Sequence, residues 1–335
     1  MNISVIIPVH NAMDTIGAVL DAVVPELHDD DQLIVADDRS TDGTESLIGA
    51  EPKVEYTKSD NPPGAAGTRN AGAARAVNQW LLFIDSDAVP AKGWRSVLEN
   101  AVRRDIHGIQ GIYGEKAPGS SASTFYKNYY YHYTFTRRIR GPEISGCATF
   151  FFAVRRDMFD RIGGFDENFA GATVEDAEFA SRLVGAGGRI LLVPDLRVHH
   201  LREYSFLELM GYEWRMMTAK MALLAGKAPG KPGSLTVSMA RPSEMVPLLA
   251  SSFLLWLVPA GLFLLLLGSD IGIWMAAVPA VLASFLQMPF WFSMISEGGW
   301  RGARAALITI PDLMMLMPAV VSSTLRALLA RRRAC

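Results

Sequence analysis

Two long stretches without a charged residue constrain this chain more than any other feature of its sequence. Residues 246–267 and 271–295 hold no Asp, Glu, Lys or Arg, and only Gly268, Ser269 and Asp270 separate them. A helix of about 20 apolar residues crosses the roughly 30 Å of hydrocarbon in a bilayer. Two such runs in succession do not fit inside a small globular core. The sequence therefore predicts two membrane-spanning helices joined by a tight turn.

A third apolar stretch, residues 305–325, has a less certain place because it contains Pro311, Asp312 and Pro318. It can span the membrane, re-enter it or lie in the interface. Arginines stand on both sides of it, at positions 301, 304, 326 and 331–333. Arginines on short loops stay cytoplasmic, so we expect only the first two stretches to span. We expect a folded domain over 1–225, a linker over 226–243 and a membrane domain over 244–335.

The part of the chain before this linker alternates short apolar runs with helical patterns. The runs 3–9, 32–36 and 80–84 are rich in β-branched or aromatic residues. Alternation at this spacing predicts βαβ units and an α/β fold, in which ligands bind beyond the carboxyl ends of parallel strands. The residues at those ends are Pro8, Val9 and Asn11, then Asp37 and Asp38, then Asp85, Ser86 and Asp87.

The third of these strand ends carries two carboxylates one residue apart. Side chains alternate along an extended chain, so Asp85 and Asp87 point the same way and concentrate negative charge. A divalent cation neutralises such charge while it bridges to a bound diphosphate. The pair therefore predicts metal-assisted phosphate chemistry, and the alternative is a solvated Asx-turn that closes the strand.

These segments, in this order, resemble the family 2 glycosyltransferases. The resemblance also includes residues 67–72 (Gly-Thr-Arg-Asn-Ala-Gly), 163–167 (Gly-Gly-Phe-Asp-Glu) and 174–179 (Val-Glu-Asp-Ala-Glu-Phe), and it extends over residues 3 to about 205. It implies a GT-A fold, a Rossmann-like domain that binds a nucleotide-diphosphate sugar and transfers the sugar with inversion. Several ordered motifs are a far more specific signal than any one of them.

The resemblance also implies roles for individual residues. Asp87 would hold Mg²⁺ or Mn²⁺ on the diphosphate, and either Asp37 or Asp38 would accept the ring N–H of the base. Arg39 stands where the family commonly has glycine, and it can contact the nucleotide or pair with Asp42. The residues expected to bind the nucleotide sugar are Pro8, Val9, Asn11, Asp37, Asp38, Arg69, Asp85 and Ser86.

Inverting transfer needs one carboxylate that deprotonates the incoming hydroxyl. We expect this base to be Asp176, with Glu175 as the alternative, because spacing alone does not separate neighbouring carboxylates. Acidic residues at a helix start are also favoured by the helix dipole, which is the structural explanation for the same pair. For the His199–His200 pair a metal-side role is implied for His200, and a purely structural histidine is the alternative.

The function expected is transfer of one sugar, of hexosyl type, to a hydroxyl of a membrane lipid or lipid-linked saccharide, as in cell-envelope polysaccharide synthesis. The run Gly-Tyr-Glu-Trp-Arg at 211–215 does not match the Q-x-x-R-W of processive synthases. Membrane anchoring raises the effective concentration of an acceptor on the same surface. Two alternatives stay open: a polyprenyl-phosphate sugar synthase, and an inactive nucleotide-binding membrane scaffold.

Composition limits the location and the partners. No basic segment followed by an apolar one precedes the first strand, so we expect no secretory signal and a cytoplasmic catalytic domain on the inner (plasma) membrane. Cys147 and Cys335 make no disulfide or metal framework, as is usual in a reducing compartment. A net charge of −2 without a basic patch argues against nucleic acid. The tyrosine-rich segment 125–140 is either an acceptor or interface element or a helix that packs its rings on the sheet.

Overall fold

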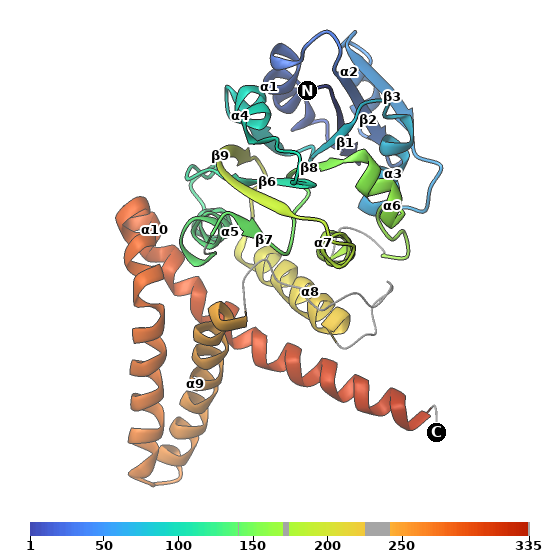
Figure 1. Cartoon of the computed structure of the whole chain (residues 1–335). Coiled ribbons are helices and arrows are strands. Elements are labelled where there is room, and N and C mark those ends of the chain that lie inside the picture. Colours follow the sequence, from blue (N-terminus) through green and yellow to red (C-terminus); the bar gives the residue numbers. More distant parts are fainter. Residues whose placement is uncertain (140, 170–173, 225–241, 334–335) are drawn as a thin grey trace. The chain divides into compact units, whose positions relative to one another are not determined.

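The computed structural model describes residues 1–139, 141–169, 174–224 and 242–333 (Figure 1). Contacts divide these residues into two compact units. The first holds residues 1–118 and 134–202, and the second holds 119–133, 203–224 and 242–333. The boundary thus differs from the expected one at 225, because two helices before that residue pack with the C-terminal helices.

Within its described residues, the first unit is built on one nine-stranded sheet with strand order β3-β2-β1-β4-β8-β6-β9-β5, and β7 pairs with β9. The strands are β1 Ile3–Val9, β2 Gln32–Asp37, β3 Val54–Lys58, β4 Trp80–Ile84, β5 Ala88–Pro90, β6 Gly108–Tyr113, β7 Glu143–Ile144, β8 Phe151–Arg155 and β9 Ile190–His200. The helices are α1 Ile16–Val23, η1 Val24–Glu26, α2 Thr44–Ile48, α3 Ala65–Arg75, α4 Trp94–Ala101, η2 Thr134–Arg138, α6 Arg156–Ile162 and α7 Glu175–Gly185.

The register of the sheet brings the predicted strand ends to one edge. β1 lies parallel to β2 and to β4, with Val9 opposite Asp37 and Ile6 opposite Phe83. β8 runs antiparallel to β4 and to β6, so the sheet is mixed beyond β4. The α/β fold expected from the alternating pattern is confirmed, and the carboxyl ends of three parallel strands meet at the same edge.

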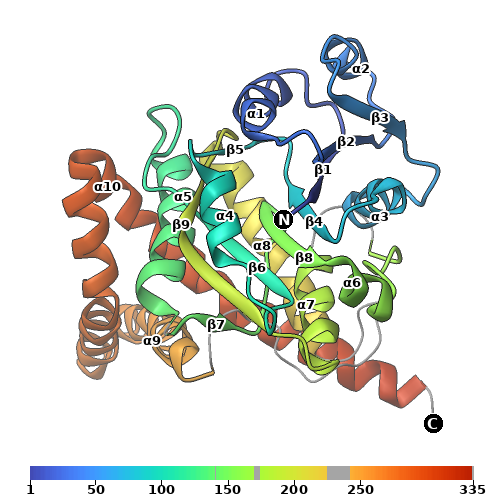
Figure 2. The same ribbon diagram turned by 45° about the horizontal axis from the view of Figure 1, so that its top comes forward.

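Helices cover both faces of this sheet, which explains why its central strands are apolar throughout (Figure 2). On one face the Phe83 ring packs edge-on against Phe165, and Phe152 packs against Phe179 of α7. On the other face Trp94 of α4 packs against Phe151. α3 approaches β1 closely at Gly72, where a Cβ would lie 2.5 Å from the Ile6 side chain.

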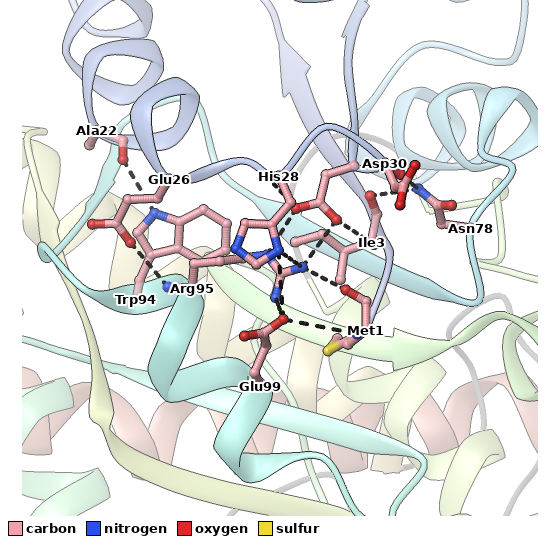
Figure 3. Close-up of polar contacts among 11 residues, drawn as sticks. Met1, Ile3, Ala22, Glu26, His28, Asp30, Asn78, Trp94, Arg95 and Glu99 are labelled. Atoms are coloured by element: carbon pink, nitrogen blue, oxygen red, sulfur yellow. Dashed lines mark hydrogen bonds and ion pairs between the residues drawn. The ribbon is translucent and has the colours of Figure 1, made fainter.

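The opposite edge of the sheet is held by a buried arginine (Figure 3). The Arg95 guanidinium bonds the carboxylate of Asp31, the carbonyl of Met1 and the carboxylate of Glu99, and only 3% of the residue is exposed. Glu26 accepts the Arg95 backbone N–H at 3.1 Å. α4, the start of β1 and the loop before β2 are therefore tied together away from the carboxyl edge.

The second unit is helical over the residues described: α5 Ala122–Tyr133, α8 Phe206–Leu224, α9 Pro242–Leu266 and α10 Ile271–Arg333. Figure 1 shows α9 beside the first half of α10. Gly261 and Gly272 let the two backbones touch, since a Cβ on either would lie 2.4 Å from the other helix. Two segments are long and apolar enough to cross a membrane, Val246–Leu266 and Ile271–Ser322.

α10 breaks at Gly299, whose φ of 53° and ψ of −130° are not helical. A Cβ on the preceding Gly298 would lie 2.5 Å from the Phe125 ring, so glycine is needed where α10 meets α5. Beyond the break, Asp312 is buried and accepts the hydroxyl of Tyr126 of α5 at 2.5 Å. The polar residue of stretch 305–325 therefore faces protein.

Candidate active site

A buried arginine connects the third strand end to the start of α7. Arg69, on α3, is 4% exposed and donates from Nη2 to Asp85 and from Nη1 to Glu175, each at 2.9 Å. Its Nε is buried without a hydrogen-bond partner, and its guanidinium lies 5.7 Å from the centre of the Phe165 ring. Burial raises the pKa of Asp85, an effect that the charge of Arg69 opposes.

Asp87, two residues after Asp85, lies next to His200. The His200 Nε2 lies 3.3 Å from Oδ2 of Asp87, because β5 and β9 pair in antiparallel register with Ala88 opposite His200. Tyr113, at the end of β6, stacks on the His200 ring at 5.2 Å. Burial acts to raise the pKa of Asp87, but the hydrogen bond and charge of His200, together with the charge of Arg202 and a backbone hydrogen bond, hold this pKa below its ordinary value.

This donor set fits a divalent cation that is shared with a substrate. Mg²⁺ is commonly held by one or two carboxylates together with substrate phosphates, and imidazole also suits transition metals such as Mn²⁺. Asp87 and His200 supply one carboxylate and one imidazole, and Asp85 stands beside them. Over the residues described there is no group of three or more His, Cys, Asp or Glu arranged as a closed metal site. A diphosphate would thus complete the coordination.

The two candidate bases at the start of α7 have different surroundings. Glu175 is 3% exposed and its carboxylate is bound to Arg69. Asp176 is half-buried, its Oδ1 accepts the Ala177 N–H at 2.7 Å, and its carbonyl accepts the Cys147 thiol. Glu175 is thus held inside the protein by an ion pair, and Asp176 is the more accessible of the two carboxylates.

The two carboxylates at the second strand end have different partners. Asp37 is 1% exposed and accepts bonds from the Ser40 N–H, the Ser40 hydroxyl and the Tyr56 hydroxyl. The Asp38 carboxylate accepts the Gly64 N–H at 2.7 Å and pairs with Arg39. Asp37 therefore shapes the loop after its own strand, and Asp38, which is half-buried, connects this strand end to the start of α3.

Arg39 and the first strand end complete this side. Arg39 pairs with Asp38 and donates to the Asn61 carbonyl at 3.0 Å, so the structure does not show the alternative in which it pairs with Asp42. Asp42 instead bonds Thr44 and the Met13 N–H, which fixes the turn before α2. Asn11 is exposed in a left-handed conformation and its Oδ1 accepts the Thr41 N–H. Pro8 and Ser86 are half-buried at their strand ends, and Val9 is buried.

The loop after α6 is bound through two asparagines, one on α3 and one in the loop before it. Glu167 accepts the side-chain amides of Asn61 and Asn70, both at 2.8 Å. Asn70 also exchanges two bonds with the backbone of Phe165, and Gly164 has a positive φ that brings its backbone against Asn70. The segments 67–72 and 163–167 therefore form one network.

Sequence reasoning missed two of these contacts. It assigned Arg69 to the nucleotide and did not link it to Glu175, which lies 106 residues away. It also missed the stacking of Tyr113 on His200, which depends on the β6–β9 pairing. One feature of the sequence could have indicated the contact of Arg69: it stands next to Asn70 in a segment rich in Gly and Ala. When such polar side chains are buried, each needs a hydrogen-bond partner.

A mixed sheet with paired carboxylates at its carboxyl edge defines the GT-A class of nucleotide-sugar transferases, and comparison with known proteins agrees. The family model described as glycosyl transferase family 2 matches residues 4–163. A second model, described as the N-terminal domain of galactosyltransferase, matches residues 129–205. Over residues 4–163 the chain is thus similar to glycosyl transferase family 2.

Individual relatives are more distant. The O-antigen chain rhamnosyltransferase RfbN of Salmonella typhimurium is 27% identical over 61% of this chain and 68% of its own length. The UDP-Glc:alpha-D-GlcNAc-diphosphoundecaprenol beta-1,3-glucosyltransferase WfaP of Escherichia coli is 32% identical over 25% of this chain. That match spans only 35% of the length of WfaP.

Among solved structures, the mannosyltransferase PcManGT from Pyrobaculum calidifontis in complex with GDP-Man and Mn²⁺ has the same fold. The match covers 97% of this chain and 86% of the PcManGT chain, with a TM-score of 0.56 and 17% sequence identity.

Proposed function

We propose that this chain is a membrane-anchored, inverting glycosyltransferase that moves one hexosyl unit from a nucleotide-diphosphate sugar to a hydroxyl of a lipid-linked saccharide or membrane lipid. The observation that carries the proposal is the linkage of the carboxyl edge to α7. Asp85 and Asp87 follow one strand, and Arg69 connects Asp85 to the residue beside Asp176.

The roles follow from this geometry. Asp87 and His200 would hold Mg²⁺ or Mn²⁺, which would neutralise charge on the departing diphosphate. Asp176 takes the proton of the attacking hydroxyl on the opposite side of the sugar, as in-line displacement requires. Arg69 bonds both Asp85, at the donor side, and Glu175 of α7, and so fixes the position of the helix that carries Asp176 relative to Asp85. Asp38, Asn11 and Ser86 lie at the strand ends where the nucleotide would bind.

The acceptor and the location are supported by the helices and the relatives. α9 and the first half of α10 are candidate spans. WfaP is named for an acceptor on diphosphoundecaprenol, and RfbN for the O-antigen chain. A lipid-linked acceptor in cell-envelope synthesis fits an enzyme anchored in the inner membrane with its catalytic domain in the cytoplasm.

The test is donor hydrolysis by the purified full chain against a panel of nucleotide sugars, with Mn²⁺, Mg²⁺ or EDTA. We expect one donor to be hydrolysed only with metal, and Asp87→Ala to abolish this activity and weaken donor binding. Asp160→Ala, which removes an exposed carboxylate of α6, serves as the matched control and should behave as wild type. Full turnover in EDTA, or wild-type kinetics in Asp87→Ala, would contradict the assignment. Nucleotide binding without any turnover would indicate the scaffold.

A further inference from the structure

The first unit contains an apolar cavity that the proposed chemistry does not use. Its volume is about 330 Å³, and its lining includes the backbone of irregular segments from two distant parts of the sequence. Phe135 and Ile139 are buried on one wall and Leu192 on the other, and Pro142 and Pro194 are exposed at the rim. The lining residues are Phe135, Thr136, Ile139, Gly141, Pro142, Leu192 and Pro194.

Two backbone irregularities shape this cavity. η2 is a π-helix, in which the Ile139 N–H bonds the Thr134 carbonyl at 2.9 Å. In β9 the register with β6 shifts between Leu192 and Arg197, so extra residues, Pro194 among them, bulge out of the sheet. π-turns and β-bulges occur frequently at functional sites. Both irregularities contribute lining residues to the same cavity, which points to a binding function.

We propose that this cavity binds the first isoprenoid units of the lipid that carries the acceptor saccharide. The inference rests on the proposed function and names the substrate class. Six of the seven lining residues are apolar or glycine, as a hydrocarbon ligand requires. The volume lies at the small end of the roughly 300–1,000 Å³ of ligand pockets, so the cavity takes a short piece of a long chain.

Arginines next to the lining residues along the chain would suit the phosphates beside such a hydrocarbon. Arg137 and Arg138 belong to η2, and Arg197 donates to the Pro194 carbonyl at 3.3 Å and also lies 3.6 Å from the Glu115 carboxylate. Charge-assisted bonds from arginine to phosphate are strong, which favours a prenyl diphosphate. Acidic groups nearby are Glu143, whose carboxylate is bound to Arg189, and the exposed Asp195.

The distance to the reacting groups fits a lipid-linked saccharide. β9 leads from Leu192 and Pro194 at the cavity to His200 at the catalytic edge. A strand rises about 3.3 Å per residue, so the six steps from Pro194 to His200 span at most roughly 20 Å. A diphosphate and a short saccharide bridge such a distance between the hydrocarbon and the hydroxyl that reacts.

The experiment uses the full chain in detergent and a C15 prenyl diphosphate that carries a diazirine. Photolabelling should map to η2, to the segment around Pro142 or to the β9 bulge, and unlabelled prenyl diphosphate should compete. Thr136→Trp and Pro194→Trp, which fill the cavity from two different segments, should reduce labelling about tenfold, equivalent to roughly 1.4 kcal/mol. Val77→Trp, at an exposed position outside the lining, is the matched control.

A kinetic arm separates binding from folding. Both cavity-filling variants should raise the KM for a prenyl-linked acceptor, with kcat and donor hydrolysis unchanged, and leave a short acceptor without the prenyl chain unaffected. Labels outside the cavity, wild-type labelling of both variants, or equal competition by phospholipid would overturn the proposal. If the wild-type chain transfers no sugar, the proposed function fails, and labelling alone still decides the cavity.

Discussion

At the residue scale, Arg69 shows how one side chain can unite a site. Its planar guanidinium offers donors in fixed directions, and two of them reach carboxylates on different elements. Removing one member of a buried charge cluster leaves the other charges unpaired. The loss of folding stability is then larger than the net stability that the whole cluster contributes. Arg69 therefore acts on the fold and on the positions of Asp85 and Glu175 together.

Arg69→Met should lower stability by about 3–5 kcal/mol, because two buried carboxylates lose their cation. Arg69→Lys should recover part of this loss, since an ammonium keeps the charge but not the forked geometry. The measurement is thermal unfolding of the full chain in detergent. Arg155→Met removes an exposed ion pair with Asp157 and should change stability by no more than about 1 kcal/mol. Equal effects at positions 69 and 155 would contradict the structural reading of Arg69.

Asp176→Asn should reduce kcat by roughly 10²-fold or more and leave donor affinity nearly unchanged, since the variant removes a base without changing size. Glu175→Gln is the companion variant. It should weaken the bond to Arg69 and act mainly through stability. Steady-state kinetics with saturating donor separate the two. An active Asp176→Asn would favour a phosphate acceptor, which needs no base, and a parallel loss of donor binding would show that Asp176 holds the nucleotide or the fold.

At the element scale, most of the tyrosine-rich segment forms α5. Its rings pack inward, with Tyr126 against Asp312 and both Tyr129 and Tyr133 against Phe290 of α10. Lys127 is also buried, and it bonds Glu213 of α8 at 2.6 Å. The tyrosines therefore do pack a helix, but against α10, whereas sequence analysis offered the sheet as their partner.

A double-mutant cycle with Tyr126→Phe and Asp312→Asn tests this junction. Each single variant should lower the thermal stability of the full chain in detergent, by about 1–3 kcal/mol, because a buried polar group loses its partner. The double variant should cost less than the sum of the two, since it removes both members of one interaction. Ser296→Ala, near the break in α10 but exposed, is the control. Strictly additive losses would show that the two groups do not interact in solution.

At the scale of the whole molecule, the question is which side of the membrane each part occupies. The turn between α9 and α10 carries no arginine, whereas Arg241, Arg301 and Arg304 flank the hairpin on its other side. We expect this turn to face outward and the arginine-flanked ends to face the cytoplasm. Burial of Asp312 against α5 agrees with a segment 305–325 that packs on protein.

Single cysteines test this topology in cells. In a Cys147→Ser background, Cys335, which lies outside the described residues, should react with an impermeant maleimide only after permeabilisation. Ser269→Cys, in a chain with Cys147 and Cys335 both replaced by serine, should react in intact cells. Labelling of Cys335 in intact cells would establish a third span. A Cys335→Ser chain, whose remaining Cys147 is 1% exposed, serves as the unreactive reference.

Much of this architecture was predictable from the sequence, because it depends on local patterns. Apolar runs ending in Asp37 and Asp85 indicated parallel strands, and strands of one parallel sheet must end at one edge. The charge-free runs indicated helices long and apolar enough to span a membrane, and the structure has helices of that length over both runs. The family motifs added the GT-A fold, which the structure and the comparisons confirm.

What only the tertiary structure decided is the partner of each polar group. Asp37 and Asp38 are equivalent in sequence, yet one is enclosed by Ser40 and Tyr56 and the other is bound to Arg39 and to the Gly64 N–H. Glu175 and Asp176 likewise differ only through Arg69, which reaches one of them across 106 residues. Pattern and propensity act over a few neighbouring residues, whereas a buried charge is stabilised by whichever opposite charge the fold brings within about 3 Å. The sequence alone therefore determines which residues gather at the carboxyl edge, and the packed structure assigns each of them a structural or a chemical part.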